Sequence, residues 1–141
     1  MKIAVLLPYK ENYSKNDTGA VSIFVNGINK LSKFKNNITI YGSTNYQPLS
    51  KNYKNFNYKK KIFQSSSKIY IKDFLRNIQN HKFDILEIHN RPHYFKYISN
   101  LNNTKKILFF HNNPLEMQGS VKKNERMDLY NKVDKIIFNS N

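Results

Sequence analysis

Apolar residues follow two different spacings along the chain, and the two alternate. Continuous apolar runs are typical of strands buried on both faces of a parallel sheet; they occupy residues 3–7, 38–41, 83–88, 106–110 and 133–138. Between them, apolar residues recur every three or four positions, as on one face of a helix, within residues 20–34, 71–78, 92–101 and 121–131. Asp17 or Thr18 is expected to cap the first helix, and Ser65, Ser66 and Ser67 to cap the second.

The strand–helix alternation predicts an α/β fold, with a doubly wound, Rossmann-like parallel sheet in one domain over residues 1–141. Residues 43–61 are polar and lack a period, so we expect a long surface loop there. Ile62 and Phe63 follow it as a short strand. Pro92 suits the first turn of a helix, where its missing N–H costs nothing.

Composition removes several classes of chemistry. The chain has no cysteine, which excludes disulfides, thiolate zinc sites, iron–sulfur clusters and cysteine nucleophiles. No apolar run approaches the roughly 18 residues of a transmembrane helix. The first apolar stretch, residues 3–7, is too short for a signal peptide. We therefore expect a cytoplasmic protein.

The net charge is +15, from 24 basic and 9 acidic residues. Such an excess is one mark of a nucleic-acid-binding surface. However, only three of the basic residues are arginines, which such surfaces favour. The abundant Lys, Asn, Ile, Tyr and Phe also fit a genome rich in A and T. We expect no specific nucleic-acid binding.

Lysines and aromatic residues mix between Lys51 and Lys61. One interpretation is a peripheral contact with anionic lipid at the inner face of the plasma membrane, the rings lying at the interface. The other is a solvated loop in a lysine-rich protein.

In doubly wound sheets, ligands bind beyond the carboxyl ends of the strands. This rule selects residues 8–20, 42–50, 88–93 and 111–119. In the first segment, Gly19 opens a helix, whose N-terminus suits a phosphate or carboxylate. A single glycine there is also an ordinary helix start.

Two polar groups directly follow apolar strands. In the first, residues 87–93, His89 and His93 lack a third ligand, so we expect no metal there. This group is expected to hydrogen-bond the loop or to place one member against a polyhydroxylated ligand. In the second, His111 precedes two asparagines, and both a structural and a catalytic role are open.

Four blocks together resemble the N-terminal domain of glycosyltransferase family 4 enzymes with the GT-B fold. They are the strand at residues 3–7 with the Thr18–Ala20 turn, Phe83–Pro92 (FDILEIHNRP), Ile107–Asn112 (ILFFHN) and Val133–Ser140 (VDKIIFNS). The middle two are most similar to enzymes that build bacterial lipopolysaccharide core or other envelope glycans.

The resemblance implies a role for several residues. Thr18, Gly19 and Ala20 would face the diphosphate of a nucleotide-sugar donor, although the family often has glycine where Thr18 stands. His111 would be the catalytic residue beside the transferred sugar. The glycan or lipid acceptor would be bound by Asn90, Arg91, Asn112 and Glu116. No metal or other cofactor is implied.

In this family, the basic residues that hold the donor diphosphate belong to a C-terminal domain. Because Asn141 directly follows an apolar strand, we expect such a domain to continue the chain. We therefore predict that residues 1–141 alone do not catalyse transfer. The main alternative is a non-catalytic flavodoxin-like or Rossmann-like binding module. An FMN or NAD module, however, would have a loop richer in Gly, Ser or Thr after the first strand than the charged residues 9–17.

Overall fold

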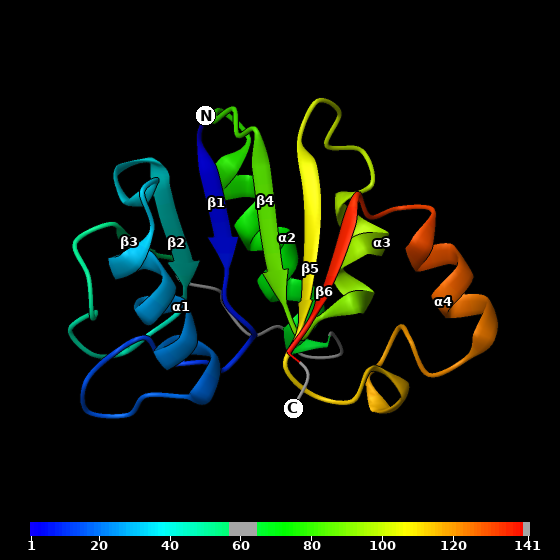
Figure 1. The fold of residues 1–141 in the computed structure, drawn as a ribbon, viewed down its shortest axis with the longest axis horizontal. Helices are drawn as coiled ribbons and strands as arrows, with labels where there is room; N and C mark the ends of the chain where they lie inside the picture. The colour runs from blue at the N-terminus through cyan, green and yellow to red at the C-terminus, as the bar shows by residue number, and fades with distance from the viewer. Residues whose placement is uncertain (57–64, 140–141) are drawn as a thin grey trace.

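The computed structural model describes residues 1–56 and 65–139 and contains a six-stranded sheet in which all strands are parallel (Figure 1). The strand order is β3-β2-β1-β4-β5-β6. The strands are β1 (Ile3–Leu6), β2 (Ile38–Gly42), β3 (Tyr53–Asn55), β4 (Ile85–His89), β5 (Lys105–Phe110) and β6 (Lys135–Phe138). The predicted α/β fold with a Rossmann-like parallel sheet is confirmed.

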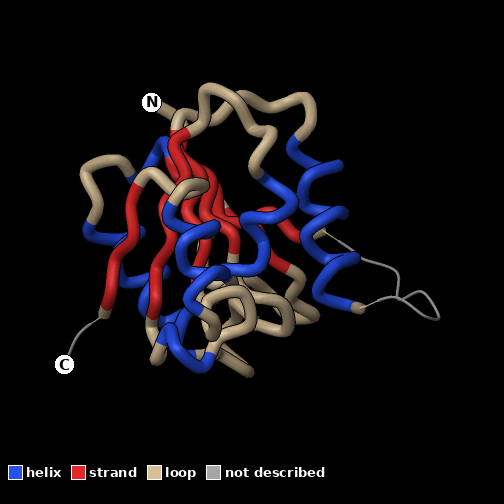
Figure 2. Tube along the Cα trace, turned by 90° about the vertical axis from the view of Figure 1, so that its right-hand side faces the viewer, coloured by secondary structure: helices blue, strands red, loops and turns tan. Residues whose placement is uncertain are grey.

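Helices lie on both faces of the sheet, as Figure 2 shows for α1 and α2. The α-helices are α1 (Ala20–Leu31), α2 (Ser66–Ile78), α3 (Phe95–Ile98) and α4 (Lys123–Tyr130). Short 3-10 helices are η1 (Lys35–Asn37), η2 (Pro92–Tyr94) and η3 (Pro114–Glu116). One apolar cluster joins α1 to β1 and β2, and the other joins α2, α3 and α4 to the opposite face.

Strand β1 shows why its sequence is apolar throughout. Ile3 and Val5 pack in the α1 cluster, whereas Ala4 and Leu6 pack in the α2 cluster, and all four are buried. Successive side chains of a strand point to opposite faces, so a strand covered on both faces needs apolar residues at every position.

Strand β3 corrects the prediction of a loop over residues 43–61. Tyr53 is buried and stacks on the ring of Tyr13 at 5.2 Å, whereas Lys54 and Asn55 are exposed. One buried residue among polar ones gives no recognisable period. The predicted strand at Ile62 and Phe63 lies outside the described residues.

The side-chain caps expected for the first two helices are not formed, although Ser65 is the N-cap residue of α2 as expected. Gly19 is the N-cap of α1; Asp17 instead accepts a hydrogen bond from Asn12, and the Thr18 hydroxyl donates to the Ser14 carbonyl. At α2, the Ser65 side chain makes no cap bond. Short polar side chains next to a helix start have several backbone partners within reach, so sequence does not select one.

Two helices are also shorter than predicted. Helix α1 ends at Leu31 instead of 34, because Ser32 is extended. The third predicted helix, residues 92–101, divides into η2 and α3 and ends at Ile98.

Two of the aromatic residues that would contact lipid in the membrane interpretation of Lys51–Lys61 are buried in the fold. Tyr53 and Phe56 are buried, with Phe56 packed against Tyr70 and Phe74, so neither ring is free to lie at a lipid surface. Residues 57–61 lie outside the described part of the chain. Among the described residues, no helix is long and apolar enough to cross a membrane.

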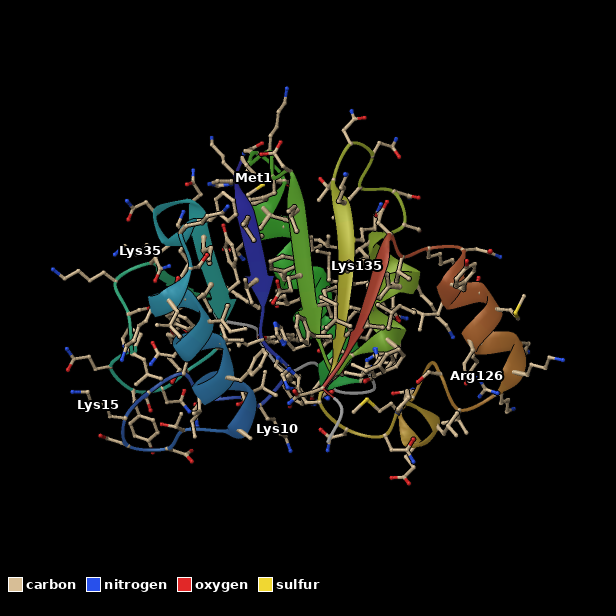
Figure 3. All side chains as sticks on the ribbon, in the orientation of Figure 1. Met1, Lys10, Lys15, Lys35, Arg126 and Lys135 are labelled. Carbon is tan, nitrogen blue, oxygen red and sulfur yellow. The ribbon has the colours of Figure 1, made fainter. Side chains whose placement is uncertain are left out.

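Basic side chains are spread over the molecule. Figure 3 labels Lys15, Lys35, Arg126 and Lys135 over different elements, with Lys10 below the end of β1. Nucleic-acid-binding proteins usually gather such residues on one face. The distribution therefore gives no support to the nucleic-acid alternative.

Candidate functional site at the carboxyl edge of the sheet

The parallel strands place most of the predicted site residues at one edge. Asn90 and Arg91 directly follow β4, and His111 and Asn112 directly follow neighbouring β5. Helix α1 begins at the same edge (Figure 1). Four of the residues assigned by resemblance are thereby neighbours although they are about 20 positions apart in sequence.

Asn90 ties the two loops together. Its Oδ1 accepts a 2.7 Å hydrogen bond from the His111 backbone N–H, and its Nδ2 donates to Asn112 Oδ1 at 2.8 Å. Its backbone has a positive φ of 52°, a conformation that asparagine tolerates better than most residues. Asn90 is only 7% exposed, and both ends of its amide bond the loop after β5. Its side chain therefore connects the two loops of the site.

His111 is the end of a chain of three hydrogen-bonded side chains. His89 Nε2 lies 2.7 Å from Glu87 Oε1, and His89 Nδ1 lies 2.7 Å from His111 Nε2. His89 is fully buried, whereas His111 is partly exposed. Burial and then the electrostatic effect of His89 lower the pKa of His111 to about 4, although the Glu87 carboxylate opposes the shift. His111 is therefore a neutral ring at pH 7.

Arg91 presents a cation beside these groups. Its guanidinium donates to the Asn90 carbonyl at 2.7 Å and to the Tyr9 carbonyl at 3.5 Å. Both acceptors are neutral, so no carboxylate neutralises the charge in these bonds. A partly buried guanidinium held in this way suits a phosphate or carboxylate on a ligand.

His93 joins η2 to the start of α2 and to the loop after β5. Its Nε2 lies 3.0 Å from the Ser67 hydroxyl, which also donates to Tyr94. Burial and then the Arg91 charge lower the pKa of His93 from 6.5 to about 4, although a hydrogen bond with the Gln118 backbone opposes the shift. His93 is thus a neutral structural link next to Arg91.

The N-terminus of α1 carries an internal anion. Glu11 Oε1 accepts a 2.8 Å hydrogen bond from the Ser22 backbone N–H, in the first turn of the helix. A Cβ on Gly19 would lie 2.1 Å from the same oxygen. The carboxylate therefore lies where the sequence predicted a diphosphate, and it supplies the cap that Asp17 and Thr18 do not.

Removing this carboxylate should weaken the helix start. We expect Glu11→Ala to lower the free energy of unfolding by about 1 kcal/mol, the usual effect of losing an N-terminal cap. Urea unfolding at pH 7 measures it. Glu116→Ala, which removes an exposed carboxylate bonded to Asn113, is the control and should change little. Equal effects of the two changes would contradict the capping role of Glu11.

The two histidines with lowered pKa also predict an acid-sensitive fold. Because the unfolded chain binds protons near pH 6.5 and the folded rings near pH 4, stability is complete above 6.5 and falls as the pH decreases towards 4. Urea midpoints between pH 7 and 4.5 should decrease accordingly. His93→Gln should make this decrease smaller; an unchanged slope would contradict the burial of a neutral ring.

Some predicted residues lie outside this group. The carboxylate of Glu116, on η3, accepts a hydrogen bond from Asn113. Thr18 and Ala20 lie beside Gly19 at the start of α1, with Ala20 exposed. The sequence identified the polar segment around His89 but not its bonds to Glu87 and His111. It also missed Glu11, for which residues 9–17 gave no signal.

Two surface cavities, of about 520 and 550 Å³, lie away from this group of residues. One of about 550 Å³ is near the amino ends of β1 and β4 and is lined by Lys2, Asn36, Asn37, Thr39, Tyr41, Lys54, Asn80, His81, Lys82 and Phe83. Its lysines are exposed, and the hydroxyl of Tyr41 is buried without a hydrogen bond among described atoms. This cavity offers a ligand mainly solvated surface groups.

Over residues 1–56 and 65–139, no cluster of three or more histidines or carboxylates is arranged to hold a metal ion. The nitrogens of His89 and His111 face each other at hydrogen-bond distance and do not converge on a common point. Comparison with known proteins finds no family model that matches the chain and no curated protein with significant similarity.

Proposed function

We propose that the chain is the acceptor-side domain of a glycosyltransferase, similar to family 4 enzymes of the GT-B fold. It would take part in moving a sugar from a nucleotide-sugar to an envelope glycan or lipid acceptor. The observation that carries the proposal is the convergence of Arg91, Asn112 and the Glu87–His89–His111 chain at the carboxyl edge of a Rossmann-like sheet.

The chemistry of these groups suits a sugar acceptor. A polyhydroxylated ligand needs several fixed donors and acceptors, which Asn112 and His111 supply from one loop. Arg91 adds a charge for a phosphate or carboxylate on the acceptor. His111, neutral at pH 7, adds no charge beside the sugar.

The donor side of the proposal requires a rearrangement. The first turn of α1 can face a diphosphate only when Glu11 has left the Ser22 N–H, because two anions repel each other at this distance. The Glu11 carboxylate is a stronger argument against an FMN or NAD module than against a glycosyltransferase domain. The phosphate of FMN or NAD would have to bind at this helix start in the isolated domain. The carboxylate gives no comparable objection to binding at Arg91 and His111.

The proposal is tested by titrating the ¹⁵N-labelled chain with a deacylated, phosphorylated lipopolysaccharide core oligosaccharide. We expect the amide signals of residues 90–91 and 111–112 to shift. Arg91→Gln should weaken the binding at least tenfold, a loss of about 1.4 kcal/mol. Arg76→Gln, a change on α2 at an exposed arginine paired with Asp73, is the matched control.

Parallel titrations with FMN, NAD and a short DNA duplex separate the alternatives. Shifts at the start of α1 with FMN or NAD, and none with the oligosaccharide, would replace the proposal by a nucleotide-binding module. Tight duplex binding with a steep salt dependence would support a nucleic-acid function. No sugar transfer from UDP-glucose or UDP-N-acetylglucosamine is expected for residues 1–141 alone, and clear turnover would contradict that expectation.

A further inference from the structure

We propose that Glu87 and His89 are positioning residues that fix the tautomer of His111. They hold the proton of the neutral His111 ring on Nε2 and leave Nδ1 bare. His111 then meets a ligand as a hydrogen-bond acceptor and not as a donor.

The order of the three side chains determines where the protons are. A carboxylate only accepts, so His89 Nε2, 2.7 Å from Glu87 Oε1, carries a hydrogen. In a neutral imidazole the other nitrogen is then an acceptor. His89 Nδ1 consequently accepts from His111 Nε2, 2.7 Å away, and His111 Nδ1 has no hydrogen.

Aromatic rings hold both imidazoles in this geometry. Phe109, the register partner of His89 on β5, stacks on the His89 ring at 5.2 Å and 10°. Phe24 of α1 meets the His111 ring edge-on at 4.7 Å. The Asn90 side chain fixes the His111 backbone. His89 is fully buried between these rings, so its two nitrogens have Glu87 and His111 as their partners.

The exposed nitrogen of His111, Nδ1, determines which ligand groups this site favours. In the described part of the protein, no donor bonds to His111 Nδ1, and the ring is partly exposed. A bare nitrogen favours a ligand hydroxyl or N–H and disfavours a carbonyl or phosphate oxygen. That the donor is a sugar hydroxyl rests on the proposed function, whereas the tautomer does not.

Long-range ¹H–¹⁵N spectra of the ligand-free protein at pH 7 test the proposal. The chain has only four histidines, so four rings need assignment. We expect His111 and His89 both to show a protonated Nε2 and an unprotonated Nδ1. A wild-type His111 that carries its proton on Nδ1 would overturn the proposal.

Variants of Glu87 test the cause. In Glu87→Leu, His89 Nε2 loses its acceptor, so His89 should donate from Nδ1 and the His111 proton should move to Nδ1. Glu87→Gln keeps an acceptor oxygen and should keep the wild-type tautomers. Glu116→Leu, at the same edge but outside the chain of bonds, should change neither ring.

A folded Glu87→Leu variant with wild-type tautomers would overturn the proposal. If this variant does not fold, the wild-type spectrum decides alone: a bare Nδ1 supports the proposal and a protonated Nδ1 overturns it. The measurement uses no ligand, so its failure differs from the failure of the oligosaccharide titration. A negative titration with the expected tautomers would reject the sugar ligand and leave the positioning role of Glu87 and His89 standing.

Discussion

Gly119→Ala is expected to lower the free energy of unfolding by about 3 kcal/mol or more, because strain and overpacking act together. Gly119 has a φ of +94°, and a Cβ there would lie 2.6 Å from the backbone nitrogen of His93. The Ser120 N–H bonds to the Met117 carbonyl at 2.9 Å, which closes a turn around Gly119. Two of the three atoms nearest to this Cβ belong to the His93 backbone and not to the end of a flexible side chain.

Gly27→Ala is the matched control for this substitution. Gly27 lies inside α1, and a Cβ there meets no atom within 4 Å. Alanine is the better helix former, so this change should raise stability by about 0.5–1 kcal/mol. Urea unfolding of the two variants beside the wild-type chain measures both effects. A Gly119→Ala variant within 1 kcal/mol of wild type would show that residues 117–120 do not pack on His93 as described.

The core strands were predictable because burial on both faces leaves a continuous mark in sequence. Residues 3–6, 38–41 and 106–110 are apolar at nearly every position, and the structure places strands there. Helix α1 was predictable for a similar reason, since Val21 and Val25 repeat at helical spacing and both are buried. In these elements local propensity and tertiary packing favour the same structure.

Strand β3 and the helix ends lack such agreement. β3 has three residues, and its pairing with β2 depends on backbone hydrogen bonds that any side chain permits. The cap of α1 comes from Glu11, nine residues before the helix begins. A contact made through a folded-back loop leaves no spacing pattern that a sequence can reveal.

The same distinction applies to the candidate site: its place in the fold was predictable, whereas its side-chain contacts were not. The topology rule selected the edge of the sheet at which these polar side chains come together, because it needs only the order of strands and helices. It did not find that Glu87 and His89 hold His111, because a strand pattern does not say which side chain of β4 meets which residue after β5. The acceptor role of Asn90 came from the family resemblance and not from this rule; in the structure both ends of its amide bond the next loop.

Asn90→Ala is expected to cost about 3 kcal/mol, of which about 1 kcal/mol is the left-handed backbone and about 1 kcal/mol each hydrogen bond to residues 111 and 112. Asn90→Gly removes the same bonds but tolerates the positive φ, so it should cost about 1 kcal/mol less than Asn90→Ala. Asn112→Ala removes only one bond and serves as the control for the loop itself.

The comparison tests whether Asn90 connects the site or binds the ligand. If it connects the loops, both Asn90 variants lose stability in urea, and the His111 amide signal shifts in the free protein because its partner is gone. If Asn90 instead awaits an acceptor, Asn90→Gly leaves stability and the free spectrum nearly unchanged and weakens only oligosaccharide binding. We expect the first result, because the amide of Asn90 is bonded at both ends to the next loop and the residue is only 7% exposed, which leaves a ligand little access to it.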